Sequence, residues 1–266
     1  MGSEMCIRDS VELDPFLAIN CTKAWLEDRL CAFLWPVILA HLREAYMGEY
    51  STVAREGHIL TVTVNRPERM NALHSMAHFE MAEIFDRFEA DDDLWIAILT
   101  GAGERAFSAG NDLKFQAEGG RRDKPASGFG GMVKRFNRNK PIIAAVNGVA
   151  MGGGFEIALA CDLIIASDQA KFALPEPKVG LAALAGGLNR LPRQIGPKRA
   201  LGMILTGRHV LPQEGVELGF VNEVVPADQL MDAAMRWAKL ILECAPLSIR
   251  ASKDVVYKSL DSASLQ

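Results

Sequence analysis

The sequence predicts an α/β fold with a largely parallel sheet. Short runs of apolar and β-branched residues alternate along the chain with segments whose apolar residues recur at helical spacing. Strands that alternate with helices in this way form right-handed βαβ units. Hydrophobic residues make up 49% of the 266-residue chain, so a substantial core can be buried, in one large domain or two small ones.

Six segments are expected to be extended. The first of them alternates apolar and β-branched residues, and the next three are continuous apolar runs, which are typical of strands buried on both faces. In chain order the six segments are residues 58–65, 95–100, 141–147, 163–167, 171–173 and 221–225.

Six further segments are expected to be helical. In the first, residues 75–90, Met76, Phe79, Ile84, Phe85 and Phe88 recur as on one face of an amphipathic helix. The other five are residues 155–161, 190–205, 212–218, 227–243 and 246–259. Residues 101–110 are rich in turn formers, and residues 119–131 show no periodicity, which indicates a mobile loop.

The domain organisation predicted from composition has three parts. Residues 1–50 have poor periodicity, and Met5 to Ser10 (MCIRDS) resembles a translated sequencing adapter. Two interpretations are open: part of this extension is not native protein, or it forms a native pair of helices. We expect the core that carries the functional residues to span residues 51–225, and a helical region to span residues 226–266.

Composition excludes several classes of function. The formal net charge of −4 argues against a nucleic-acid-binding protein, which would present a basic face. The longest apolar run, residues 30–40, is interrupted by Pro36, is too short to span a bilayer and does not resemble a signal peptide. The five cysteines form no CxxC pair, which indicates reduced thiols. We therefore expect a cytoplasmic protein with neither a membrane nor a nucleic-acid partner.

Three consecutive glycines stand between a predicted strand and a predicted helix, in NGVAMGGGFE (residues 147–156). Glycines permit a sharp turn and the close approach of a ligand to the backbone. The first N–H groups of the helix lack intrahelical partners, and the helix dipole favours negative charge there. The segment is therefore a candidate oxyanion site, although tight packing alone would also explain it. In AFSAGNDLK (residues 106–114), the turn at Ala109 to Asn111 presents a second candidate N–H group.

Two glutamates are candidate acid/base groups. Glu156 falls in the first turn of the helix that follows the glycines, beside the candidate oxyanion site. Glu176 lies between Pro175 and Pro177, which stiffen the backbone around it. A glutamate held in this way within an apolar stretch is unusual for an ordinary surface residue. For any single glutamate in a proline-rich loop, however, exposure to solvent is the more common situation.

Taken together and in this order, the motifs resemble the crotonase (enoyl-CoA hydratase/isomerase) family. The matching segments are NRPERMNAL, AFSAGNDLK, MGGGFEIALACDLIIA and KFALPEPKVG, which begin at residues 65, 106, 151 and 171. The resemblance extends from about Glu49 to about Val256 and implies a crotonase-like ββα spiral core with C-terminal helices. Family chains normally continue with further helix, so we expect the C-terminal helical region to be incomplete.

The resemblance also implies the roles of individual residues. The backbone N–H groups of Asn111 and Gly153 would form an oxyanion hole for the thioester carbonyl, and Glu156 and Glu176 would be the acid/base pair. The coenzyme A (CoA) portion and the acyl group would meet eight further positions, namely Arg69, Ala72, Leu73, Ser108, Ala109, Asp112, Leu113 and Gly152.

The implied activity is that of an enoyl-CoA hydratase, which reversibly adds water to a 2-trans-enoyl-CoA and forms a 3-hydroxyacyl-CoA. Negative charge builds on the thioester oxygen, where each preorganised N–H donor is worth on the order of 3 kcal/mol. Glu176 would protonate Cα and Glu156 would hold and activate the water. CoA would be part of the substrate, with no permanently bound cofactor and no metal. The family resemblance further implies a homotrimer or a dimer of trimers.

Other functions within and outside the family stay open. Ala183 and Leu184 stand where hydratases usually carry proline and glycine, which puts the acyl preference in question. The phrase GGGFE…FALPE also resembles the carnitinyl-CoA dehydratase group, and a double-bond isomerase or a catalytically weak CoA-thioester-binding paralogue are further alternatives. A metal site at His74 and His78 is disfavoured because no acidic third ligand stands near them.

Overall fold

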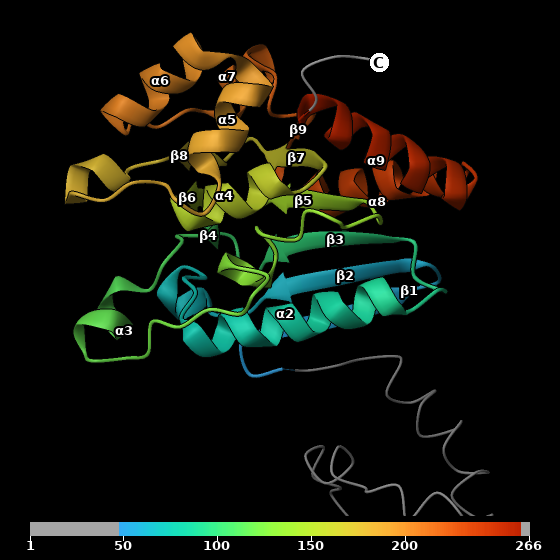
Figure 1. Ribbon diagram of the computed structural model, residues 1–266, viewed down its shortest axis with the longest axis horizontal. Helices are drawn as coiled ribbons and strands as arrows, with labels where there is room; N and C mark the ends of the chain where they lie inside the picture. Colours follow the sequence, from blue (N-terminus) through green and yellow to red (C-terminus); the bar gives the residue numbers. More distant parts are fainter. Residues whose placement is uncertain (1–47, 262–266) are drawn as a thin grey trace, which may run out of the picture. The chain divides into compact units, whose positions relative to one another are not determined.

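The computed structural model describes residues 48–261 (Figure 1). Expectations for residues 1–47, including the adapter-like segment and three of the five cysteines, lie outside the described residues. Of the other two cysteines, Cys161 is buried and Cys244 is exposed, and both are free thiols.

The described strands form two sheets. The larger sheet has six strands in the order β1-β2-β3-β5-β7-β9, and only β1 runs antiparallel to its neighbour. The smaller sheet is parallel, with three strands in the order β4-β6-β8. The bounds are β1 Ser51–Glu56, β2 Ile59–Val64, β3 Ile96–Gly101, β4 Ala106–Ser108, β5 Ile142–Val146, β6 Val149–Met151, β7 Leu163–Ser167, β8 Lys171–Ala173 and β9 Glu223–Val225.

Helices connect most of these strands and extend the chain beyond β9. The α-helices are α2 Ser75–Ala90, α3 Leu113–Ala117, α4 Gly153–Ala160, α5 Gly187–Ile195, α6 Pro197–Thr206, α7 Pro212–Leu218, α8 Leu230–Leu242 and α9 Pro246–Asp261. Within residues 48–261, four short 3₁₀ helices accompany them, namely η2 Pro67–Arg69, η3 Phe129–Gly131, η4 Glu176–Val179 and η5 Ala227–Gln229.

The larger sheet is covered on both faces, which explains the continuous apolar runs of its central strands. Residues alternate along β3: Ile96 and Ile98 pack in a cluster with α8, whereas Ala97 and Leu99 belong to the cluster that contains α2 and α4. Figure 1 shows α2 and α8 on opposite sides of the sheet. The predicted α/β fold with a largely parallel sheet is therefore confirmed.

Several predicted elements differ from the structure in ways that local pattern explains. Strands β4 and β6 have only three residues each, too few to show a periodicity, and both were missed. The edge strand β1 was missed as well, because its residues are mostly half-buried or exposed and lack a clear apolar face. The helix predicted at residues 190–205 is two helices, since Gly196 and Pro197 break it.

Two further corrections concern which residues are buried. Met76 and Phe79, predicted on the apolar face of residues 75–90, are 38% and 44% exposed, so the buried face of α2 is turned away from them. The predicted mobile loop at residues 119–131 ends in η3, whose residues are buried against α2 and α4.

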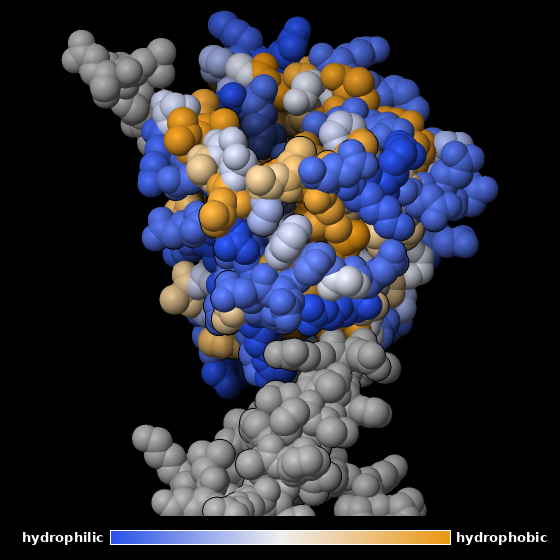
Figure 2. Space-filling view, turned by 90° about the vertical axis from the view of Figure 1, so that its right-hand side faces the viewer, coloured by the Kyte–Doolittle hydropathy of each residue, from blue (hydrophilic) through white to orange (hydrophobic). Residues whose placement is uncertain are grey.

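The surface of the described residues mixes hydrophobic and hydrophilic side chains. Figure 2 shows this for the side that lies at the right of Figure 1. Within residues 48–261, no helix combines the length and the apolar character needed to cross a bilayer.

Candidate active site

The three glycines form a tight turn between β6 and α4, and a second loop packs directly onto it. Gly152 has φ +52° and precedes the helix. A Cβ atom on Gly154 would collide with the Ser108 carbonyl oxygen, and one on Gly110 would lie 2.9 Å from the Gly153 nitrogen. Because a side chain at either position would separate the two loops, glycine is required for their contact.

This contact brings together the two predicted oxyanion-hole donors. Asn111 directly follows Gly110, and Gly153 begins α4. The chain on either side of Asn111 is held by two hydrogen bonds to Leu73, from Leu73 N to Gly110 O and from Asp112 N to Leu73 O. Within the described residues, the N–H groups of Asn111 and Gly153 donate to no acceptor. They are therefore available to an external oxyanion, and the N-terminus of α4 favours negative charge beside Gly153.

Glu156 is a buried carboxyl group one turn into the same helix. Only 3% of the residue is exposed, and one carboxylate oxygen accepts a hydrogen bond of 2.9 Å from the Gly187 N–H. Burial raises its pKa to about 7, while the Gly187 N–H lowers it and the charge of Glu176 raises it further. A carboxyl group with this pKa is present in both protonation states near neutral pH, which suits general acid/base catalysis.

Glu176 reaches the glycine turn from a different element, one that follows the neighbouring strand of the smaller sheet. It opens η4, just after β8, which pairs with β6. Its Oε1 atom lies 2.9 Å from the position that a Cβ of Gly152 would occupy, so the carboxylate rests against the turn. Its Oε2 atom is buried and finds no hydrogen-bond partner among the described residues, and burial raises its pKa. An unpaired buried carboxylate oxygen beside an oxyanion site is a candidate for contact with substrate or water.

Among the eight predicted CoA-contacting residues, Leu73, Ser108 and Asp112 have buried side chains that hold the loop in shape. Leu73 is fully buried. Ser108 donates to Asn71 O at 2.8 Å and accepts from Gly110 N at 3.1 Å, so its hydroxyl holds the loop in shape. Asp112 caps α3 and forms an ion pair of 3.0 Å with Arg66. These three side chains support the loop, and the polar atoms of Ser108 and Asp112 are engaged within the protein.

The other five predicted contacts are placed differently. Arg69 and Leu113 are exposed, Ala109 is half-buried, and Ala72 and Gly152 are buried. Ala109 N donates to Met70 O at 2.9 Å, which ties the two predicted segments to each other. That these residues contact CoA stays a prediction.

Sequence reasoning missed a buried support behind the glycine turn. His78 Nδ1 accepts from Gly130 N at 3.0 Å, and its ring lies 4.4 Å from that of Phe129, centroid to centroid. Burial lowers the pKa of His78 to about 3, so its imidazole is neutral and acts as an acceptor. Nothing in the spacing of α2 distinguishes such a histidine from a metal ligand or a surface residue.

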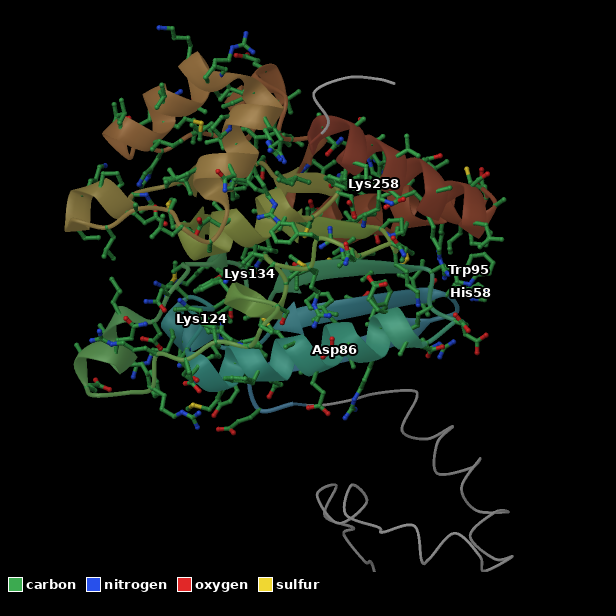
Figure 3. All side chains as sticks on the ribbon, in the orientation of Figure 1. His58, Asp86, Trp95, Lys124, Lys134 and Lys258 are labelled. Atoms are coloured by element: carbon green, nitrogen blue, oxygen red, sulfur yellow. The ribbon has the colours of Figure 1, made fainter. Side chains whose placement is uncertain are left out.

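The remaining described histidines are structural or lie elsewhere. His74 caps α2 by accepting from Ala77 N at 3.2 Å. His58 stacks on Trp95 with ring centroids 4.1 Å apart, at the end of the larger sheet opposite α3 (Figure 3). Within residues 48–261, no group of three or more His, Cys, Asp or Glu side chains is arranged to hold a metal ion.

Comparisons with known proteins find relatives that match most of the chain. The family model described as enoyl-CoA hydratase/isomerase matches residues 54–266. The chain is 46% identical over 211 residues to the carnitinyl-CoA dehydratase of Escherichia coli K12, covering 79% of this chain and 80% of that protein. It is 44% identical over 222 residues to the carnitinyl-CoA dehydratase of Proteus mirabilis, covering 83% and 84%.

Solved structures of similar proteins have the same fold. A carnitinyl-CoA hydratase from Mycobacterium avium is 40% identical with a TM-score of 0.76, over 80% of this chain and 82% of that one. An enoyl-CoA hydratase from Mycobacterium tuberculosis H37Rv is 37% identical with a TM-score of 0.77, over 81% and 84%. The two sheets and the helices that follow β9 are therefore an arrangement that this chain shares with solved structures.

Proposed function

Because this chain belongs to the enoyl-CoA hydratase/isomerase (crotonase) family, we propose that it is a hydro-lyase acting on acyl-CoA thioesters, and that it dehydrates a carnitinyl-CoA-type substrate. Carnitinyl-CoA is a 3-hydroxyacyl thioester that carries a trimethylammonium group beyond the hydroxyl. In this family the enzymes need no bound cofactor, and CoA is part of the substrate.

One observation carries the proposal. Two carboxyl groups with raised pKa values lie at the glycine turn: Glu176 rests against Gly152, and its charge acts on Glu156 in the first turn of α4. Beside them, the Gly153 N–H has no acceptor among the described residues. Elimination of water from a 3-hydroxyacyl thioester needs one group that takes the proton from Cα and one that gives a proton to the departing hydroxyl. It also needs donors for the charge that builds on the thioester oxygen. The site holds candidates for all three tasks.

In the proposed reaction, the thioester oxygen accepts hydrogen bonds from Asn111 N–H and Gly153 N–H. Glu176 removes the Cα proton, the Cα–Cβ double bond forms, and the C–O bond at Cβ breaks as Glu156 protonates the leaving hydroxyl to water. In the direction of hydration, Glu156 holds and activates the water and Glu176 protonates Cα. The pKa of about 7 at Glu156 lets it act in both directions near neutral pH.

The choice of substrate rests on the comparisons. The sequence alone put a straight-chain enoyl-CoA hydratase first and a carnitinyl-type dehydratase second. Identities of 44–46% to carnitinyl-CoA dehydratases support the second more strongly than the first.

A straight-chain enoyl-CoA hydratase remains the second candidate because of the segment that follows Glu176. Val179 to Gly187 contains no charged residue. Ala183 is buried beside Gly187, whereas Leu181 and Leu184 are exposed. A quaternary ammonium is favoured by aromatic faces or by a carboxylate, and an uncharged segment of this kind suits an apolar acyl chain instead.

The test is a direct comparison of two thioesters. Purified protein is assayed for hydration of crotonobetainyl-CoA and of crotonyl-CoA, by product analysis and by loss of enoyl absorbance. A kcat/KM at least tenfold higher for crotonobetainyl-CoA supports the carnitinyl-type assignment, and the reverse ratio supports the straight-chain hydratase. If neither is hydrated and a 3-enoyl-CoA is isomerised, the hydro-lyase proposal is wrong. Analytical ultracentrifugation of the same sample tests the trimeric state that the family resemblance implies.

A further inference from the structure

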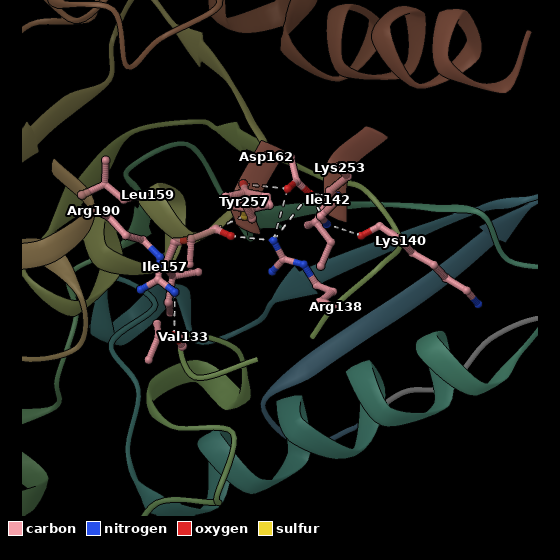
Figure 4. Close-up of polar contacts among 12 residues, drawn as sticks. Val133, Arg138, Lys140, Ile142, Ile157, Leu159, Asp162, Arg190, Lys253 and Tyr257 are labelled. Atoms are coloured by element: carbon pink, nitrogen blue, oxygen red, sulfur yellow. Dashed lines mark hydrogen bonds and ion pairs between the residues drawn. The ribbon is translucent and has the colours of Figure 1, made fainter. Parts of the chain in front are cut away.

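Arg190 folds back over the start of its own helix and holds the turn there. It is the fourth residue of α5, and its backbone N–H donates to Gly186 O at 2.8 Å. Its guanidinium lies so close to Gly186 that a Cβ atom on this glycine would collide with Nη1. Nη2 donates to Val133 O at 2.7 Å, a contact drawn in Figure 4. The side chain therefore binds the Gly186 turn to the segment that follows η3.

The same turn holds the Glu156 carboxylate. Gly187, the next residue, donates its N–H to Glu156 Oε1 at 2.9 Å, and a Cβ on Gly187 would lie 3.1 Å from that oxygen. Guanidinium and carboxylate thus contact consecutive residues of one turn. The positive charge of Arg190 acts on the largely buried Glu156 and favours its ionised form.

We propose that Arg190 is a positioning residue for Glu156: it fixes the Gly186–Gly187 turn that donates to this carboxylate, and its charge favours the ionised form of the carboxylate. The inference rests on the proposed function only in so far as Glu156 is the group that handles water. It concerns a residue 34 positions away in the sequence that forms no part of the motifs.

Several other groups around Glu156 also influence whether it is protonated or ionised. Burial and the charge of Glu176 favour protonated Glu156, whereas the N–H groups of Gly187 and Ala185 and the charge of Arg190 favour the carboxylate. Arg190 is itself largely buried, close to the Arg138 charge, and its guanidinium lies 5.8 Å from the centroid of the Phe136 ring. Arginine stays protonated even there, so its charge persists across the working pH range.

The experiment measures the protonation of Glu156 directly. Infrared difference titration follows the carboxyl band that E156Q removes, in the parent, in R190Q and in R190K. Glutamine keeps an N–H donor for Val133 O but loses the charge, whereas lysine keeps the charge. We expect the Glu156 midpoint to rise by about one pH unit in R190Q and to stay within a few tenths of a unit of the parent in R190K. The control R199Q changes an exposed arginine of α6 and should leave the midpoint where it is.

An unchanged midpoint in R190Q, even with lowered thermal stability, would overturn the proposal and leave Arg190 a purely structural residue. If R190Q does not fold, R190M, which keeps an apolar stem beside Phe136, makes the same comparison with R190K. In an active enzyme, the acidic limb of the pH profile of kcat/KM should move in the same direction as the midpoint. If the parent turns over none of the thioesters, the proposed function is wrong. The titration still tests the role of Arg190, because it measures the protonation of Glu156 and needs no turnover.

Discussion

Phe129 lies directly against Gly153: a Cβ atom at Gly153 would stand 2.5 Å from both Cε1 and Cζ of the ring. The ring belongs to η3, which is held from behind by the bond between Gly130 N and His78 Nδ1. The backbone N–H that we assign to the oxyanion hole is therefore positioned by an aromatic side chain from a distant loop. The fit leaves no room for a methyl group.

We expect Gly153→Ala to lower kcat by about 10²–10³-fold, because the displaced turn no longer presents its N–H correctly. Alanine suits a helical backbone well, so any loss arises from the collision with Phe129. The double variant with Phe129→Leu should recover part of the rate, which steady-state kinetics would measure. Unchanged activity in Gly153→Ala would contradict the assignment of this N–H.

Gly202→Ala is the matched control and a prediction in its own right. Gly202 is exposed in α6, and a Cβ there would meet nothing within 4 Å. Alanine in a helix interior is more stable than glycine by about 0.5–1 kcal/mol. We expect calorimetry to show a melting temperature raised by about 1–4 °C, with activity unchanged.

Removing either acid/base group should abolish most of the activity. Glu176→Gln and Glu156→Gln keep the size of the side chain and remove the exchangeable proton, so kcat should fall by about 10²–10⁴-fold in each. Glu104→Gln, at an exposed glutamate, is the control and should behave as the parent. A Glu176→Gln enzyme that retains full activity would exclude this residue from proton transfer at Cα.

The buried Glu156 makes stability depend on pH in a defined direction. Its pKa is raised from 4.5 to about 7 in the folded protein, so the folded state holds a proton that the unfolded state releases. The contribution of Glu156 to stability is fully present below pH 4.5 and is lost as the pH rises through about 7, by at most about 3 kcal/mol. Glu156→Gln should thus gain stability relative to the parent between pH 5 and 8. Denaturant unfolding at several pH values would measure this gain, and a difference that does not vary with pH would contradict it.

Helix α9 is anchored to the core through one aspartate, as Figure 4 shows. The Asp162 carboxylate accepts from Lys253 Nζ at 2.8 Å, from the Tyr257 hydroxyl at 2.9 Å and from Ile142 N at 2.7 Å. Arg138, whose side chain is 6% exposed, lies 3.5 Å away on the other side. These cations and hydrogen bonds hold the pKa of Asp162 below its usual value in spite of burial.

Asp162→Asn should therefore destabilise the protein by about 3–5 kcal/mol, because it leaves the charges of Arg138 and Lys253 buried without a counter-ion. Asp228→Asn, at an exposed aspartate in η5, should change stability by less than about 0.5 kcal/mol. Hydrogen exchange would show whether the amides of α9 lose their protection first in Asp162→Asn. Equal stability of the two variants would mean that the anchor contributes little.

Much of the fold could be predicted because its elements are long or strongly patterned. The bounds predicted for α2, α7, β7 and β8 agree with the structure, since each has clear periodicity or a clean boundary. Of the second sheet only β8 could be predicted, because the short segments of β4 and β6 become strands only by pairing with each other and with β8. Pairing of this kind is a tertiary property that a local window does not contain.

The sequence by itself determined that the chain is an α/β protein of the crotonase family, with Glu156 in the first turn after three glycines and Glu176 between two prolines. The position of each glutamate relative to its neighbouring glycines or prolines is a local feature, because these residues follow one another in the chain. Only the tertiary structure decided that Glu176 rests on Gly152, that Phe129 packs against Gly153, and that the Gly186–Gly187 turn lies between Arg190 and Glu156. These relationships depend on which groups share a buried volume, and burial is also what raises the pKa of both glutamates.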